Sequence, residues 1–393
     1  MGVSWVKIAY RNTSHDFLVL LSSGLMLKSL KIENFRCFQF FELPQLGKVN
    51  LLVGTNNSGK TSLLEAIQLF CSRANLGVFR EVMINRGEYL LNEESTENRA
   101  LSRGLIKDNR ELDIRHLFYG HEVDVGSKFS ITGDNDNESK SLIISIHENK
   151  PESGSFEHLE ELVLSIDWLS QDEEPIKVPL SPNIGLPLEY IRRFRQELKN
   201  LEARTQFVTS SSLTTEKMID LFDQVVLQPE EEIITQALKI IEPSLKRIAS
   251  VGSEKYRLSD SRSGFVVRLS DSNQRIPIGS MGDGIWRMLG LTLAIVHATG
   301  GVLLVDEIDT GFHFSTMSDM WKLIWETAKQ LNVQVFATTH NSDCWTSLAK
   351  IANSESPSEE GITIQRIERD RPTSIIFNER QIVIAAERGI EVR

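Results

Sequence analysis

One octapeptide constrains the fold of this chain more than any other stretch: Gly54–Thr61, with the sequence GTNNSGKT. It follows the apolar run Val49–Val53 and leads into Ser62–Phe70, whose apolar residues recur at helical spacing. A strand, a glycine-rich loop and a helix in this order form a phosphate-binding P-loop. Gly54 and Gly59 permit backbone angles that turn several N–H groups toward one anion. An isolated match can arise by chance, but the flanking strand and helix favour a nucleotide site.

Two side chains of this loop are expected to act directly on the nucleotide. Lys60 reaches the β- and γ-phosphates, and the Thr61 hydroxyl is placed to bind Mg²⁺. Lys60 also counts as catalytic, because it supplies the loop's own side-chain cation. The residues predicted to bind the nucleotide here are Gly54, Asn57, Ser58, Gly59, Lys60 and Thr61. The expected ligands are ATP and Mg²⁺.

Two buried strands in the last third of the chain end in side chains suited to phosphate chemistry. The run Gly301–Val305 is continuously apolar and is followed by Asp306 and Glu307. Asp306 is predicted to hold the Mg²⁺ hydration shell, and Glu307 to orient or deprotonate the attacking water. The second run, 333–339, ends at His340, which can donate to the γ-phosphate. Taken alone, His340 could equally be a strand-end histidine satisfied by its neighbours.

A serine among glycines precedes the apolar helix predicted at 288–296. Ser280, Gly282 and Gly284 can offer a hydroxyl and bare backbone N–H groups to a phosphate. Alone, such a segment is more often an ordinary turn. Its position between the P-loop and the acidic strand end makes these three residues candidates for nucleotide binding.

The middle of the chain differs from both ends. Short strands are predicted at 129–132, 142–146, 162–166 and 176–178, and helices begin near residue 186, Thr214 and Pro229. The predicted division is an N-terminal extension over 1–25, a nucleotide-binding core over 26–72 and 255–393, a strand-rich insertion over 73–182 and a helical lobe over 183–254. Met26 is an alternative natural start.

One face of the first predicted helix carries Arg192, Arg195 and Lys199. This strip could contact DNA, RNA or an acidic partner, although a solvated charged face is the simpler interpretation.

Composition narrows the class of protein. A net charge of −11 argues against a surface that is basic throughout, and no apolar run approaches the ~20 residues of a membrane span. Three scattered cysteines do not form a disulfide or zinc framework, so we expect a cytoplasmic protein with no membrane contact. His116 and His121, near Glu122 and Asp124, could suggest a metal site, but two histidines without a second pair are usually surface or packing residues.

The order of these motifs resembles the ABC-type ATPases, and within them the group of RecF, SMC and overcoming-lysogenisation-defect (OLD) proteins. The matching segments, in chain order, are Ile32–Arg36 (opening strand), Gly54–Thr61 (Walker A), Ser280–Gly284 (signature loop), Asp306 and Glu307 (Walker B), Asp309–His313 (D-loop) and His340 (switch histidine). The resemblance implies an α/β P-loop NTPase with an ABC-ATPase-like head and a mainly parallel core sheet. Gln171 is the candidate for the Q-loop glutamine.

The resemblance also implies partners. Heads of this group dimerise around two ATP molecules, each held by one subunit's Walker motifs and the other's signature loop, so a homodimer or higher oligomer is expected. In OLD proteins a Toprim nuclease domain follows the ATPase, whereas this chain ends at Arg393 without the carboxylates of such a domain. A separate nuclease or effector, in DNA-linked or anti-phage defence, is therefore the expected partner. The alternatives are a transporter cassette and an ATP-binding scaffold without turnover.

Overall fold

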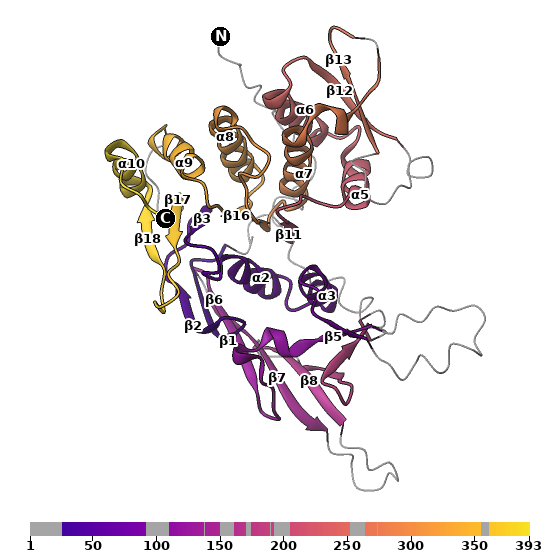
Figure 1. The fold of residues 1–393 in the computed structure, drawn as a ribbon, viewed down its shortest axis with the longest axis vertical. Helices are drawn as coiled ribbons and strands as arrows, with labels where there is room; N and C mark the ends of the chain where they lie inside the picture. Colours follow the sequence, from indigo (N-terminus) through magenta and orange to yellow (C-terminus); the bar gives the residue numbers. More distant parts are fainter. Residues whose placement is uncertain are drawn as a thin grey trace, which may run out of the picture.

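A six-stranded sheet forms the centre of the molecule (Figure 1). Its order is β11 (Thr205–Val208), β15 (Val302–Val305), β16 (Gln334–Thr338), β3 (Val49–Val53), β17 (Ile362–Arg366) and β18 (Ile375–Asn378). Neighbours from β11 to β17 pair in parallel, and β18 is antiparallel to β17. This computed structural model describes residues 26–91, 110–136, 138–149, 161–169, 174–188, 190–191, 205–251, 264–272, 274–354 and 361–393.

Helices cover both faces of this sheet, because alternate residues of a strand point to opposite sides. Val49, Leu51 and Val53 of β3 belong to the hydrophobic core shared with α7 (Asp283–His297), α8, α9 and α10. Leu52 belongs to the other core, with α2 and α3. The other helices just named span Lys60–Cys71 (α2), Leu76–Asn85 (α3), Phe314–Gln330 (α8), Ser342–Ser354 (α9) and Glu379–Arg388 (α10). The P-loop thus lies where a doubly covered parallel sheet meets α2.

The strand-rich insertion forms an antiparallel sheet beneath α2 and α3 (Figure 1). Its order is β2 (Phe38–Leu43), β1 (Ser29–Phe35), β6 (Lys128–Asp134), β7 (Ser139–Asn149), β8 (Glu161–Trp168) and β9 (Ile176–Pro179). The four strands predicted within the insertion are confirmed. However, β1 pairs with β6 as well as β2, so this sheet joins segments on both sides of the predicted boundary after residue 72.

Two three-stranded sheets complete the fold. One contains β10 (Gly185–Pro187), β5 (Arg110–Asp113) and β4 (Tyr89–Leu91), and the other contains β12 (Leu245–Ser250), β13 (Phe265–Leu269) and β14 (Ile276–Pro277). Short 3₁₀ turns lie at Ile114–Leu117 (η4), Tyr119–His121 (η5) and Ile278–Met281 (η7).

The described part of the predicted helical lobe, 183–254, contains both helices and strands. Helices α5 (Thr215–Val225) and α6 (Glu230–Ile241) begin after Thr214 and Pro229 as predicted, and the Thr214 side chain accepts from the Lys217 N–H. The same segment also contains strands β11 and β12. A four-residue strand such as β11 is specified by its parallel partner β15, which lies far away in sequence, and not by a local pattern.

Three predictions fall outside the described residues: the extension 1–25, the basic strip at Arg192, Arg195 and Lys199, and the Q-loop candidate Gln171. Among the residues that are described, no helix is both long and apolar enough to traverse a membrane.

Candidate nucleotide site

The P-loop connects the end of β3 to the start of α2. Gly54 has φ +145°, Asn57 +60° and Gly59 +97°, so the loop uses backbone conformations that favour glycine. A Cβ on Gly59 would lie 2.3 Å from the Phe38 ring, and one on Gly54 would lie 2.4 Å from the Ile367 carbonyl oxygen. Both glycines are therefore required by backbone angle and by space.

Lys60 is buried at the first position of α2, with 6% of its surface exposed. Its Nζ donates to the carbonyls of Gly54 at 3.0 Å and Thr55 at 2.7 Å, which folds the loop around the ammonium group. Burial lowers the pKa of Lys60 to about 8, against the opposing influence of the Asp306 and Glu307 carboxylates. Lys60 is thus mainly protonated at neutral pH.

The Walker B-like strand end meets the P-loop through Asp306. The Thr61 hydroxyl donates to the two oxygens of Asp306 at 3.3 and 3.2 Å. From the neighbouring strand β16, the Thr338 hydroxyl donates to Asp306 Oδ1 at 2.6 Å and accepts from the Glu307 N–H at 2.8 Å. One threonine therefore fixes both carboxylate residues, a role that the sequence analysis did not assign to it.

These side chains surround one cavity of about 300 Å³. Of the predicted site residues, it is lined by Asn57, Ser58, Gly59, Lys60, Thr61, Asp306, Glu307 and His340. Burial, followed by the charge of Lys60, lowers the pKa of His340, which favours a neutral imidazole in this cavity at neutral pH.

Another part of the cavity wall was not predicted. It contains Arg36, Arg86 and Glu88, together with His116 and His121. Arg36 forms ion pairs with Glu88 at 2.6 Å and with the buried Glu65 at 2.7 Å. The two histidine rings pack edge to face, with their centroids 5.2 Å apart. Within the described residues, no group of three or more His, Cys, Asp or Glu side chains could hold a metal ion. The histidines are thus part of the wall of the P-loop cavity.

The signature-like loop lies apart from this cavity. Ser280 is exposed in η7, and Gly282, with φ +91°, precedes the first residue of α7. A Cβ on Gly284 would lie 3.1 Å from the Gly311 carbonyl, so the loop packs against the D-loop-like segment of the same chain. Ser280, Gly282 and Gly284 do not line the cavity that holds Lys60.

Known proteins resemble this chain in sequence. A family model described as AAA ATPase domain matches residues 26–164 and 188–344. This chain belongs to that family. The resemblance to ABC-type ATPases of the RecF, SMC and OLD group is confirmed, and the AAA ATPase domain here has the mixed α/β fold of a P-loop ATPase.

Three similar proteins differ in how much of this chain they match. An ATP/GTP phosphatase of Helicobacter pylori is 24% identical over 332 residues, covering 81% of this chain and 86% of that protein. An OLD nuclease of Thermus scotoductus is 50% identical over 44 residues, which are 11% of this chain and 8% of that protein. The structure of an SMC head domain from Thermotoga maritima aligns with 90% of this chain and 99% of its own, at 12% identity and a TM-score of 0.44.

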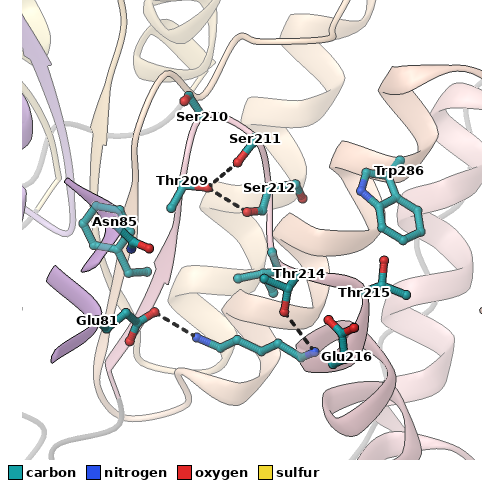
Figure 2. Close-up of a pocket in the computed structure, with 13 residues that line it drawn as sticks. Glu81, Asn85, Thr209, Ser210, Ser211, Ser212, Thr214, Thr215, Glu216 and Trp286 are labelled. Carbon is teal, nitrogen blue, oxygen red and sulfur yellow. Dashed lines mark hydrogen bonds and ion pairs between the residues drawn. The ribbon is translucent and has the colours of Figure 1, made fainter. Parts of the chain in front are cut away.

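A second cavity of the AAA ATPase domain, of about 550 Å³, lies beside the loop that follows β11. Figure 2 shows the hydroxyl side chains of Thr209, Ser211 and Ser212 on this loop, Thr214 at the start of α5 and Trp286 of α7. The Thr209 hydroxyl donates to the Ser212 carbonyl at 2.8 Å. This loop stands next to the Walker B-like strand end, because β11 and β15 are parallel neighbours.

Arg287 of α7 connects these two strand ends and was also missed by the sequence analysis. A charged arginine among the apolar residues that follow Gly284, seven residues after Ser280, is the signal that could have identified it.

Proposed function

We propose that this AAA ATPase domain binds ATP with Mg²⁺ and hydrolyses it to ADP and phosphate in the P-loop cavity. The observation that carries the proposal is the meeting of Thr61 and Asp306 at 3.2 Å, beside the buried ammonium of Lys60. A P-loop hydroxyl, a strand-end carboxylate and a lysine in one cavity are the parts that phosphoryl transfer requires. The family and the phosphatase relative support an ATPase in general terms.

The residues present fit the expected metal ion. A hydroxyl and a carboxylate are the hard oxygen ligands that Mg²⁺ prefers, and Mg²⁺ usually takes only one or two protein ligands beside phosphate and water. Thr61 and Asp306 would hold it. When bound, the ion supplies neutralisation of charge on the phosphate oxygens.

The protein's own groups divide the remaining work. The P-loop N–H groups and Lys60 bind the phosphate chain and orient the γ-phosphoryl group. Glu307 takes a proton from a water molecule as the water oxygen bonds to the γ-phosphorus and the bond to the leaving ADP oxygen breaks. Neutral His340, with one ring N–H, can donate to the γ-phosphate.

The same proposal assigns Ser280, Gly282 and Gly284 to a second copy's nucleotide. Ser280 and Gly282 are exposed, and none of the three residues lines the chain's own cavity, which supports a homodimer in which the signature-like loop completes the facing site. By the resemblance to OLD proteins, the dimer would control a separate nuclease or effector as part of a bacterial defence system. It would act in the cytoplasm and could contact DNA or RNA. This biological setting rests on the resemblance alone.

Steady-state phosphate release tests the proposal and separates it from a scaffold without turnover. Wild-type protein should release phosphate in a Mg²⁺-dependent manner, and Lys60→Ala should greatly weaken ATP binding and abolish release. Lys322→Ala, which removes a half-exposed lysine of α8 that pairs with Glu326, is the matched control and should change neither. Normal binding and hydrolysis by folded Lys60→Ala protein would refute the assignment. Copurification with a membrane permease would instead favour a transporter cassette.

A further inference from the structure

Arg287 ties three parts of the molecule together. It lies near the start of α7, is only 3% exposed, and directs its guanidinium toward two loops at the carboxyl edge of the core sheet. One terminal nitrogen donates to the Thr209 carbonyl, and the other donates to the carbonyls of Asp306 at 2.8 Å and Glu307 at 3.0 Å. The loops after β11 and β15 are thereby fixed to the helix that carries the signature-like loop.

The chemistry of arginine suits this arrangement. Burial lowers the pKa of Arg287 to about 10, although nearby Asp306, Glu307 and Asp309 act in the opposite direction, so the group stays cationic at neutral pH. A planar guanidinium offers several N–H donors in a rigid fork and can hold carbonyls from two loops at once. A lysine ammonium carries its donors on a single atom and cannot reproduce this geometry.

The backbone that Arg287 holds is unusual. Glu307 has φ +48°, in the left-handed region that residues other than glycine seldom adopt. Its N–H donates to Thr338 Oγ1 at 2.8 Å, and its carbonyl accepts from Arg287 and from the Thr310 N–H at 3.0 Å. Both polar backbone groups of Glu307 are therefore held, which sets the direction in which its side chain leaves the strand end.

We propose that Arg287 is a positioning residue that holds Glu307 in this backbone conformation. The direction of the Glu307 carboxylate then depends on the position of α7. The inference rests on the proposed function, since it needs Glu307 as the group that accepts the proton from water. Arg287 itself touches neither nucleotide nor water in this scheme and acts through Glu307.

Single-turnover and steady-state hydrolysis by Arg287→Lys protein test the proposal. Displacement of a catalytic group by about 1 Å can cost on the order of 100-fold in rate, so kcat should fall by about that factor while ATP affinity stays near the wild-type value. Thr292→Val is the matched control, because it removes another buried donor from α7, one that bonds only to the Met288 carbonyl. Thermal melting establishes that each variant is folded, and Arg287→Gln replaces Arg287→Lys if the lysine variant is not.

A double-mutant cycle with Glu307→Gln distinguishes positioning from a general structural role. If Arg287 acts through Glu307, adding Arg287→Lys to Glu307→Gln should lower the residual rate no further. A wild-type kcat for folded Arg287→Lys overturns the inference, and so does a further loss in the Glu307→Gln background or an equal loss in Thr292→Val. If Glu307→Gln alone hydrolyses ATP normally, the assignment of Glu307 as the base fails while ATP hydrolysis itself stands, and the inference about Arg287 fails with that assignment.

Discussion

The Walker end of the core sheet comprises the P-loop and the strand end at Asp306 and Glu307. It differs from the signature-like loop in how many of its polar groups are bonded within the chain. At the Walker end, Lys60 is buried on loop carbonyls and Thr61 is paired with Asp306. At the other, Ser280 is exposed, and a Cβ placed on Gly282 would meet nothing within 4 Å. The first region is preorganised by contacts within the chain, whereas the second offers backbone and a hydroxyl to the outside.

The physical reason lies in the neighbours of each region. Parallel strands bring their carboxyl ends to one edge, so groups at the ends of β3, β15 and β16 are forced together. The loop before α7 packs at Gly284 against the D-loop-like segment and Ile241 of α6, but Ser280 and Gly282 stay exposed. From this difference we expect that one chain suffices to bind nucleotide and that two are needed to hydrolyse it.

The largest effect is expected from Glu307→Gln, which changes the Walker end only. Loss of a general base typically costs about 10²- to 10⁴-fold in rate, while the contacts to phosphate and Mg²⁺ remain. ATP should therefore accumulate uncleaved, and the dimer should become longer-lived. Phosphate release measures the first effect, and size-exclusion chromatography with ATP measures the second.

Two outcomes would contradict that prediction. Wild-type turnover by Glu307→Gln protein would show that another group activates the water. A variant that is inactive but also fails to bind ATP would show that Glu307 supports the cavity and does not serve as a base. Asp343→Asn, an exposed acidic residue at the start of α9, is a charge-matched control that should behave as wild type.

The signature-like loop is tested by Ser280→Arg, which places a bulky cation where the facing γ-phosphate would dock. Binding to one chain should survive, while pairing and turnover should fail. Mixing Ser280→Arg with Lys60→Ala chains should restore part of the activity, because a mixed dimer has one site with an intact Walker A from one chain and an intact signature loop from the other. Phosphate release from the mixture is the measurement.

That experiment also tests whether the two regions cooperate at all. If Ser280→Arg chains hydrolyse ATP at the normal rate as monomers, the signature assignment is wrong and the Walker end works alone. If mixed dimers form but the mixture is no more active than the separate variants, the composite site is refuted, provided that one such site can hydrolyse ATP alone.

A smaller effect is expected from pH at the Walker end. The pKa of Lys60 is lowered to about 8, and only its protonated form attracts phosphate. As pH rises through 8, the free protein loses this proton, so ATP affinity should fall by up to about tenfold per pH unit. Below pH 7 Lys60 contributes no such slope. Equilibrium binding of a fluorescent ATP analogue between pH 7 and 9.5 is the measurement.

The control for this titration is Lys60→Arg, whose guanidinium keeps its charge throughout the range. If that variant binds ATP, its affinity should not follow the wild-type slope. If the ATP affinity of the wild-type protein does not change across the same pH range, the charge of Lys60 does not contribute to nucleotide binding.

No effect at all is expected on DNA, the last property to be tested. If the Walker end is the chain's one catalytic centre, purified protein should not cut DNA, even with Mg²⁺ and ATP. Gel analysis of plasmid DNA checks this, with Glu307→Gln protein in parallel. Metal-dependent cleavage that survives Glu307→Gln and follows this polypeptide through purification would reveal a second centre, most readily sought in the 105–180 segment.

Elements with local signals could be predicted from the amino-acid sequence. The P-loop spacing, the apolar run before Asp306 and the caps at Thr214 and Pro229 each lie within about ten residues, and the structure contains the corresponding strands and helices. Glycine spacing, hydrophobic period and capping chemistry act through neighbouring residues, which is why a single sequence reveals them.

Which of these elements contact one another could not be predicted from local sequence and is known from the fold. Strand β11 is recognised by its pairing with β15, and β1 joins the insertion's sheet through β6. The contacts of Thr338 with Asp306 and Glu307, and of Arg287 with three carbonyls, span 19 to 78 residues of sequence. Such contacts depend on how parallel strands are ordered and on which helix covers their ends, and no local propensity encodes that order.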